Sequence, residues 1–365
     1  MNQPNSVVAL LGRPDSPTDG VADYCGFLCR ALERRGVDLK IVHAPAVEEK
    51  WFRCLPHLWR ASAQWLGKWV LLQYTALAWS RHGFPVQAVA AILLMRARGL
   101  RCGVVFHEPF RQGGDTNLTW KDAIRGRCQE WVIRALYRFS LLNIFTIPLG
   151  SIKWLPENPK NSVFIPLGPN LPEYVVPADE THDRNGPMTV AVFCVSEPPY
   201  REREVGEISH AMRAASAAVH DLRIIFLGKG TQEAQDEIAR AFAGIPVEVS
   251  NLGLCSLEDI SRVLAESDAT LCVRGKLNLR RGSALAGIAS AVPVVGYSGA
   301  AEWPLLEAGI EFVPFGDKEA LGAALTRVLT DRSRRQRLRE KNLLVLQKYF
   351  SWDSIAVSFI RALNG

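Results

Sequence analysis

The sequence lacks the patterns that mark several classes of protein. Its eight cysteines form no Cys-x-x-Cys pair, and most lie in apolar runs, where a free cysteine behaves as a small hydrophobic residue. We therefore expect a reducing cytoplasm and no zinc site. The most apolar run, residues 86–95, contains Gln87 and is too short to cross a bilayer. No basic region precedes a long apolar stretch at the start of the chain, so no signal peptide is evident.

Motifs for nucleotides and metals are also missing. Gly228-Lys229-Gly230 has no glycine three residues further on, so it is not a dinucleotide fingerprint, and no P-loop occurs. His107-Glu108 does not begin a His-Glu-x-x-His zinc motif, and no Asp-x-Asp is present to hold a metal against a diphosphate. We therefore expect no metal and no cofactor. A diphosphate ligand would have to be neutralised by side chains and backbone N–H groups.

The composition is that of a globular, mildly basic protein. With 365 residues the chain is longer than a single core usually supports, and 48% hydrophobic and 22% charged residues exclude disorder. The net charge of +6 suits anionic partners such as nucleotides, phosphates or acidic lipid heads. It is well below the dense basic character of a dedicated nucleic-acid binder, so we expect no nucleic-acid partner.

The first half alternates between strand and helix patterns. An apolar run at 7–11, a helical spacing at 21–35 and a second apolar run at 39–43 form a β-α-β unit. Because such units build parallel sheets, residues 1–170 are predicted to form a Rossmann-like domain. The further elements expected in it are strands at 69–74, 102–107, 143–147 and 162–166 and helices at 86–99 and 123–140.

A second α/β series follows a linker. Four prolines and two glycines between 168 and 187 predict a linker at 171–188. Residues 189–350 repeat the strand–helix alternation as a second Rossmann-like domain, and 351–365 form a last helix expected to pack back toward the first domain. The predicted fold class is thus α/β, with two doubly wound parallel-sheet domains facing a cleft.

A basic cluster stands where the second domain would bind a ligand. Arg274 directly follows the predicted strand 269–273, and Arg281 precedes Gly282 and Ser283 at the start of a helix pattern. Gly282 would let a ligand approach the backbone, Ser283 is a good N-cap, and the arginines could bind phosphate bidentately. The plain alternative is a capped helix with solvated arginines. The position at the carboxyl end of a strand favours a phosphate site.

Seven motifs resemble, in the same order, those of the family-4 type of GT-B glycosyltransferases. They are PTDGVADYCGFLCRALERRG, VVFHEPF, FIPLGPN, RIIFLGKG, VSNLGLCSLEDISRVLAESDATLCV, AVPVVGYSGAAEW and YFSW. The resemblance implies a GT-B fold with the acceptor bound by the first domain and a nucleotide-diphosphate sugar by the second. It also implies transfer of the sugar to a glycan or lipid-linked acceptor with retention of the anomeric configuration, in a polysaccharide pathway.

The chain departs from that family at one place. Two glutamates eight residues apart ordinarily precede the Pro-Val-Val turn, and here those positions are Asn278 and Ala286. Ala286 cannot accept a hydrogen bond from a ribose, and the sequence RRGSA stands between the two positions. A non-catalytic GT-B-like binding or scaffold protein is therefore the alternative function. A phosphorylase would need a lysine-bound pyridoxal phosphate, for which no motif is evident.

Two further groups are candidates for the donor. Gly20 lies at the start of the helix pattern 21–35, where N–H groups could face a phosphate; alternatively Asp19 caps a tight turn there. Lys229 could reach the diphosphate, or it keeps a turn soluble. The predicted donor residues are Gly20, Lys229, Arg274, Arg281, Gly282 and Ser283.

Three residues are candidates for catalysis. His107 ends an apolar strand with Glu108 beside it, and the resemblance implies contact with the transferred sugar or the acceptor. A structural histidine is the alternative. Glu302 could bind donor hydroxyls, or it is an acidic residue favoured at a helix N-terminus.

Aromatic and basic residues alternate in two stretches of the first half. Residues 51–81 contain five tryptophans among arginines and lysines, and 120–138 add Trp120 and Trp131 among five basic residues. This pattern suits peripheral contact with an anionic membrane, at its inner face, which a lipid-linked acceptor would require. An aromatic core with a solvated basic rim is the alternative.

Overall fold

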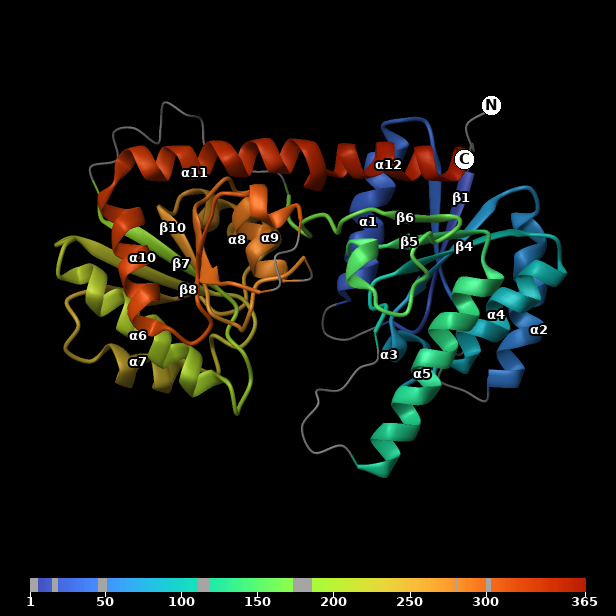
Figure 1. Cartoon of the computed structure of the whole chain (residues 1–365), viewed down its shortest axis with the longest axis horizontal. Helices are drawn as coiled ribbons and strands as arrows, with labels where there is room; N and C mark the ends of the chain where they lie inside the picture. Colours follow the sequence, from blue (N-terminus) through green and yellow to red (C-terminus); the bar gives the residue numbers. More distant parts are fainter. Residues whose placement is uncertain are drawn as a thin grey trace. The chain divides into compact units, whose positions relative to one another are not determined.

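The computed structural model describes residues 6–14, 19–44, 51–110, 119–172, 186–279, 281–299 and 303–365, with the backbone alone at 51–54. The chain divides into two compact units (Figure 1). Unit 1 comprises Met1–Gly168 with Trp352–Gly365, and unit 2 comprises Pro169–Ser351.

Unit 1 is built on a parallel sheet. Among the described residues its strands are β1 (Ser6–Leu11), β2 (Asp38–His43), β3 (Trp69–Tyr74), β4 (Arg101–Phe106), β5 (Leu142–Phe145) and β6 (Ser162–Phe164). Their order is β2-β1-β3-β4-β5-β6, and every pairing is parallel. The order reverses between β1 and β3, which makes their carboxyl ends the switch point of this sheet.

Helices cover both faces of that sheet. Because successive strand residues point to opposite faces, Val8 and Leu10 of β1 pack in one core and Val7 and Ala9 in the other. The first core lies under α2 (Trp51–Ala61), α4 (Val86–Ala97) and α5 (Trp120–Phe139), and the second under α1 (Gly20–Glu33) and α12 (Trp352–Asn364). A short α3 (Ala76–Trp79) joins β3 to α4.

The last helix belongs to unit 1 through Trp352. Its indole stacks on Phe27 of α1, with ring centroids 5.4 Å apart. The same indole lies so close to Gly168 that a Cβ built there would be 2.7 Å from its ring carbons. Glycine is therefore required at 168, because any side chain would displace α12.

Unit 2 repeats the architecture with a different strand order. Its described strands are β7 (Met188–Phe193), β8 (Leu222–Leu227), β9 (Glu248–Asn251), β10 (Ala269–Cys272), β11 (Val294–Tyr297) and β12 (Ile310–Val313). They pair in parallel in the order β12-β11-β10-β7-β8-β9. The order reverses between β7 and β10, so the ligand edge predicted for this sheet is their carboxyl ends.

The helices of unit 2 also lie in two layers. Val190 and Val192 of β7 face the core under α6 (Arg201–Ser216), α7 (Gln235–Phe242) and α10 (Lys318–Thr330). Ala191 faces the opposite core, under α8 (Leu257–Ala265) and α9 (Gly282–Ala289). The chain then continues through α11 (Arg332–Val345) and a π-helical turn, Leu346–Phe350, to α12.

The predicted fold class is confirmed: the chain is α/β, with two doubly wound parallel sheets. Three of the described helices were not predicted: α2, the four-residue α3, and α11. The sequence of α2 contains Pro56, which disfavours a helix interior, and α11 is too polar for an apolar spacing to stand out. Among the described helices, none combines the length and apolar character needed to cross a bilayer.

Candidate functional site

Three neighbouring strands of unit 2 are followed by residues that interact in pairs. Arg274 follows β10, Ser196 follows β7 and Lys229 follows β8, and these strands are adjacent in the sheet. Arg274 Nε donates a hydrogen bond to Ser196 Oγ at 3.3 Å. Lys229 Nζ lies 3.6 Å from Glu197 Oε1, and both side chains are largely exposed. Arg274, which was predicted from its strand-end position, and Lys229 thus both lie at the carboxyl edge of the sheet.

The glycines beside Lys229 have a structural reason. Gly228 and Gly230 have φ angles of +91° and +85°, a region that favours glycine. A Cβ at Gly230 would lie 2.1 Å from the carbonyl oxygen of Val195, and Val195 N donates to the Lys229 carbonyl at 3.0 Å. The loops after β7 and β8 are therefore in close contact, which holds the Lys229 backbone beside the carboxyl end of β7.

The start of α9 brings the second arginine to the same edge. The guanidinium of Arg281 lies against Gly275, where an added Cβ would be 3.1 Å from Nη2. Both Arg281 and Arg274 are half-buried. Burial raises the pKa of the Cys272 thiol at the end of β10, while hydrogen bonds from Thr270 and Ser283 and the charges of the two arginines oppose that shift. Arg274, Arg281 and Ser283 are thus all near enough to Cys272, at the end of β10, to act on the pKa of its thiol.

The prediction that Ser283 caps α9 is wrong. The helix begins at Gly282, and its N-cap is Arg281, whose side chain makes no capping hydrogen bond. The reason is the preceding turn, in which Arg281 N donates to the Asn278 carbonyl and Arg281 O accepts from Ala284 N and Leu285 N. Ser283 is buried inside the first turn. The first N–H groups of α9 consequently have no carboxylate or hydroxyl cap at their N-cap residue, while Gly282 is exposed.

The two positions of the missing glutamates differ in environment. Ala286 is 2% exposed and packs in the core between α8, α9 and the sheet. Asn278 is half-buried in the turn before α9. A carboxylate at 286 would be desolvated in that core, so the space is organised for an apolar residue. Glu302 lies outside the described residues, and its expected role stays a prediction.

At the corresponding edge of unit 1, α1 is capped by an acid. Asp19 Oδ1 accepts hydrogen bonds from Val21 N and Ala22 N, each at 3.0 Å. The N–H groups of Val21 and Ala22, at the helix start that was a candidate for a phosphate, are thus already used by a carboxylate. The geometry here matches the alternative of a tight capped turn.

His107 follows β4 at this edge and is buried. Its Nε2 lies 2.8 Å from Gln73 Oε1, and the ring stands edge-on to Tyr24 with centroids 5.0 Å apart. Burial lowers the pKa of His107 to about 4, against the charge of Asp19, which acts to raise it. The imidazole is therefore neutral near pH 7. With Nε2–H donating to the Gln73 oxygen, Nδ1 carries the lone pair.

Glu108 lies in the loop that follows β4. Glu108 is half-buried, and its charge contributes to the raised pKa of the buried Tyr74, which is due mainly to desolvation. Trp154 Nε1 donates to the Pro109 carbonyl at 2.8 Å and anchors the loop.

Sequence reasoning missed several partners of these residues. Gln73, Tyr24 and Ser196 were not singled out, although Gln73 is the one amide within the apolar strand WVLLQY. A polar residue inside a buried strand is a signal that a hydrogen-bond partner stands nearby. In the described part of the chain, no three or more His, Cys, Asp or Glu residues form a group that could hold a metal ion.

Comparison with known proteins shows the fold. Neither a family model nor a curated protein sequence matches the chain. Among solved structures, HepE of Anabaena in complex with UDP and glucose has a TM-score of 0.67 and 12% identity over 100% of both chains. A putative UDP-N-acetylglucosamine 2-epimerase from Listeria monocytogenes gives 0.66 and 12%, over 99% of this chain and 96% of that one.

A third solved structure agrees with these two. An α,α-trehalose-phosphate synthase (UDP-forming) from Burkholderia vietnamiensis gives a TM-score of 0.61 and 12% identity, over 100% of this chain and 97% of that one. The identities are too low to carry an activity across, and what they share with this chain is the architecture. The chain therefore has the GT-B fold.

Proposed function

We propose that the chain is a glycosyltransferase that moves a sugar from a nucleotide-diphosphate sugar to a glycan or lipid-linked acceptor. The observation that carries the proposal is the position of Arg274 and Arg281 between β10 and α9 at the carboxyl edge of the second sheet, with the Arg281 guanidinium beside Gly275. Ligands of open α/β sheets bind at this edge. HepE has the same fold and was crystallised with UDP-glucose, which makes a UDP-sugar the first donor to test.

The chemistry follows from the charge of the leaving group. When the bond between sugar and diphosphate breaks, negative charge grows on the departing phosphate oxygen. Arg274 and Arg281 would bind that oxygen, and the first N–H groups of α9 would add a dipole contribution of about 0.3–1 kcal/mol. Because the charge is largest in the transition state, these contacts increase kcat as well as affinity. The same groups make transfer independent of a metal, and retention is expected from the family resemblance.

The acceptor side is assigned to unit 1. A neutral imidazole whose Nδ1 carries a lone pair can accept a hydrogen bond from a sugar or acceptor hydroxyl, and Gln73 fixes the ring for this task. Glu108 follows His107 directly and supplies a carboxylate for a second hydroxyl. In this role His107 stays neutral, and Glu108 acts as a carboxylate, so neither side chain needs a positive charge.

A donor screen tests the proposal. Release of nucleotide from UDP- and GDP-sugars identifies the donor, and Arg274→Ala or Arg281→Ala should lower kcat/KM at least tenfold without unfolding the chain. Arg240→Ala, which removes an exposed arginine from α7, is the matched control and should leave the rate unchanged. Wild-type rates in both site variants would remove the phosphate role.

A non-catalytic binding or scaffold protein is the second candidate. It is favoured by Ala286, which lies in the core where the resembling family has a glutamate for the ribose. Isothermal titration with UDP and GDP separates the two functions. Binding of either nucleotide, lost in Arg274→Ala, supports the enzyme, whereas no heat from any nucleotide supports the scaffold.

One face of α5 suits contact with an anionic membrane, where a lipid-linked acceptor would be located. Trp120, Ile124 and Trp131 are 71%, 49% and 56% exposed, and their spacing of four and seven residues places them along one side of the helix. The exposed basic residues of α5 are Lys121, Arg127, Arg134 and Arg138. Exposed indoles beside basic side chains are typical of helices that lie on anionic lipid surfaces.

Vesicle co-sedimentation tests this contact. The chain should bind vesicles of phosphatidylglycerol and phosphatidylcholine, and Trp120→Ala with Trp131→Ala should lower the bound fraction several-fold. Trp303→Ala, which removes an exposed indole from unit 2, is the control. Equal binding by all three chains would exclude α5 as the membrane contact.

A further inference from the structure

The guanidinium of Arg274 is held by a hydroxyl and not by an acid. Its Nε donates to Ser196 Oγ at 3.3 Å, and no carboxylate of the described residues forms an ion pair with it. Arg274 is half-buried, and it follows β10 at the carboxyl edge of the second sheet. Because a hydroxyl is neutral, it orients the guanidinium without cancelling the positive charge. The full charge of Arg274 is therefore available to a ligand.

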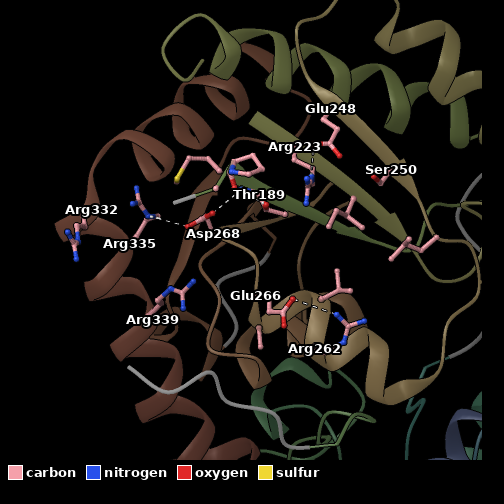
Figure 2. A pocket seen from close by; sticks show the side chains of 17 residues that line it. Thr189, Arg223, Glu248, Ser250, Arg262, Glu266, Asp268, Arg332, Arg335 and Arg339 are labelled. Atoms are coloured by element: carbon pink, nitrogen blue, oxygen red, sulfur yellow. Dashed lines mark hydrogen bonds and ion pairs between the residues drawn. The ribbon is translucent and has the colours of Figure 1, made fainter. Parts of the chain in front are cut away.

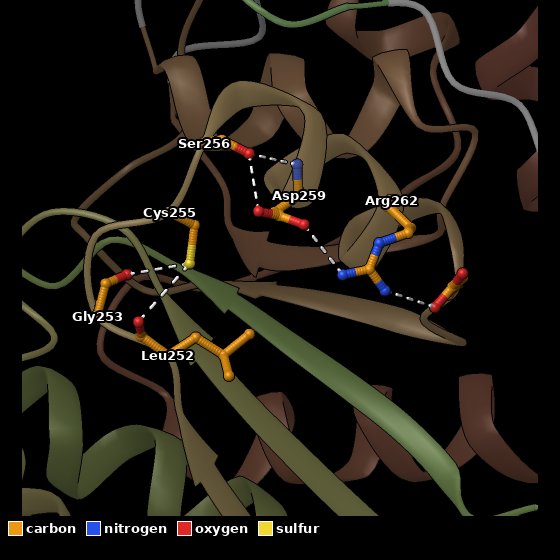
Figure 3. A network of polar contacts seen from close by, with 7 residues as sticks. Leu252, Gly253, Cys255, Ser256, Asp259 and Arg262 are labelled. Carbon is orange, nitrogen blue, oxygen red and sulfur yellow. Dashed lines mark hydrogen bonds and ion pairs between the residues drawn. The ribbon is translucent and has the colours of Figure 1, made fainter.

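Other arginines of unit 2 have acidic partners. In the pocket of Figure 2, Arg223 lies beside Glu248 at the amino edge of the sheet, with Nε 2.9 Å from Oε2. Figure 3 shows Arg262 of α8 beside Asp259, with Nη2 3.1 Å from Oδ1. The adjacent carboxylate balances the charge of each of these two side chains. The neutral partner of Arg274 is what distinguishes it from them.

All three polar groups of Ser196 have a partner. Its N–H donates to Glu204 Oε2 at 2.8 Å, and its carbonyl accepts from Arg201 Nε at 3.3 Å. Both partners lie in the first turn of α6, and Glu204 is only 1% exposed. The third group is the hydroxyl, which accepts from Arg274. The backbone of Ser196 is thus fixed from α6, and only rotation about its Cα–Cβ bond could move the hydroxyl away from Arg274.

The two residues before Ser196 are fixed as well. Cys194 N donates to the Leu227 carbonyl at 2.8 Å, and Val195 N donates to the Lys229 carbonyl at 3.0 Å. Cys194 has a φ of +68°, in the left-handed region that is unfavourable for a residue with a side chain. Such a conformation persists where the surroundings hold the backbone in place. Three consecutive N–H groups after β7 therefore have acceptors, and the loop holds Ser196 in one position.

The hydrogen bond from Nε limits how Arg274 can bind a phosphate. A guanidinium can donate to two phosphate oxygens through either of two edges, one formed by Nε with a terminal nitrogen and the other by both terminal nitrogens. At Arg274 the Nε–H is already used by Ser196. The edge left for a ligand is therefore that of Nη1 and Nη2. Without the hydroxyl, the guanidinium could rotate, and neither edge would be favoured.

We propose that Ser196 is a positioning residue of the donor site, whose hydroxyl fixes Arg274 so that Nη1 and Nη2 together bind one phosphate of the nucleotide-diphosphate sugar. This inference rests on the proposed function, because it concerns an arginine assigned there to the leaving group. Ser196 acts through Arg274 and needs no contact with the donor. A lysine at 274 would keep the charge but lose the paired N–H groups.

The Nε–H signal of Arg274 tests this hydrogen bond without any ligand. In nitrogen–proton correlation spectra of the full chain, the signal is identified by its loss in Arg274→Lys. Hydrogen bonding protects an N–H group from exchange with water, so Ser196→Ala should increase the exchange rate about threefold. Ser196→Thr keeps a hydroxyl and should keep the slow rate. The matched control is Ser216→Ala, which removes a hydroxyl that donates to the Arg213 carbonyl in α6. Equal rates in Ser196→Ala and the wild type overturn the proposal.

Turnover of the donor identified in the screen tests the consequence for catalysis. Because the charge on the departing phosphate is largest in the transition state, Ser196→Ala should lower kcat about tenfold and raise KM by less than about twofold. Ser196→Thr should restore kcat, and Ser216→Ala should leave it unchanged. Wild-type kcat in Ser196→Ala overturns the positioning role and leaves the glycosyltransferase in place. A wild type that turns over no donor contradicts the glycosyltransferase instead, and the exchange rates then decide whether Ser196 holds Arg274.

Discussion

The two sheets carry different groups at their carboxyl edges. In unit 1, the first helix at the carboxyl edge begins behind Asp19, whose carboxylate occupies its N–H groups, and the neighbouring His107 is neutral and buried. In unit 2, α9 begins behind Arg281, which does not cap it, and Arg274 stands beside it. The edge of unit 1 already carries a carboxylate, whereas the edge of unit 2 carries two arginines. This contrast is the reason why we propose an anionic ligand for unit 2 and a neutral, hydroxyl-bearing ligand for unit 1.

Lowering the pH should reduce the stability of unit 1, and this is the largest effect we expect. The pKa of His107 falls from 6.5 to about 4 on folding, so the unfolded chain binds a proton more readily between these values. Stability is then fully present above pH 6.5 and is lost as the pH falls toward 4, by about 3 kcal/mol at most. Urea unfolding of the wild type and His107→Gln from pH 7.5 to 4 measures this. The variant should show a flatter profile, and parallel profiles would contradict the buried neutral state.

An acidic cap on α9 should make the carboxyl edge of unit 2 bind anions less well. Arg281→Asp gives α9 the kind of cap that α1 has, so the chain should gain about 1 kcal/mol of stability while its affinity for nucleoside diphosphates falls about a hundredfold. Thermal unfolding and isothermal titration report the two effects separately. A variant that loses stability and binding together would indicate misfolding, and unchanged affinity would show that Arg281 does not face the phosphates.

Removing the cap of unit 1 should have a smaller effect. Asp19→Ala leaves Val21 N and Ala22 N without their acceptor, at an expected loss of about 1 kcal/mol. Asp23→Ala is the control, since Asp23 lies in the same first turn and is not the cap. Urea unfolding compares the two, and nucleotide affinity should be unaffected in both. If Asp19→Ala lost nucleotide affinity and Asp23→Ala did not, the start of α1 would be supported as a contact of the nucleotide-sugar donor.

Removal of divalent metals should have the smallest effect of all. Because the charge at the carboxyl edge of unit 2 comes from arginine side chains, EDTA should leave the rate of nucleotide release within about twofold of the untreated rate. The assay follows release from the donor found in the screen, with Mg²⁺ re-added as the control. Strict dependence on a divalent ion would refute the metal-independent mechanism.

Much of the architecture could be predicted from local patterns. The strand at 269–273 with Arg274 directly after it placed one arginine correctly, because an apolar run and the residue that ends it are adjacent in the sequence. The cap of α9 could not be found this way. It depends on a turn that starts at Asn278, and Ser283 looks like a better cap than Arg281 by residue type alone.

Contacts between distant segments were beyond sequence reasoning for a different reason. Arg274 and Ser196 are 78 residues apart, and nothing local connects them. Likewise, Gln73 and His107 are 34 residues apart, and only the pairing of β3 with β4 brings them together. Sites formed by tertiary packing need the register of the sheet, which local periodicity does not contain.

The contact between Gly168 and Trp352 has a consequence for how the chain is assembled. The residue where the polypeptide leaves unit 1 touches the residue where it returns, so the whole of Pro169–Ser351 is an insert whose two junctions are neighbours. A short flexible linker from residue 168 to residue 352 would connect the rest of unit 1 directly to α12. Unit 2 is thus one continuous segment that we expect could be removed, exchanged or transferred to another scaffold as a block.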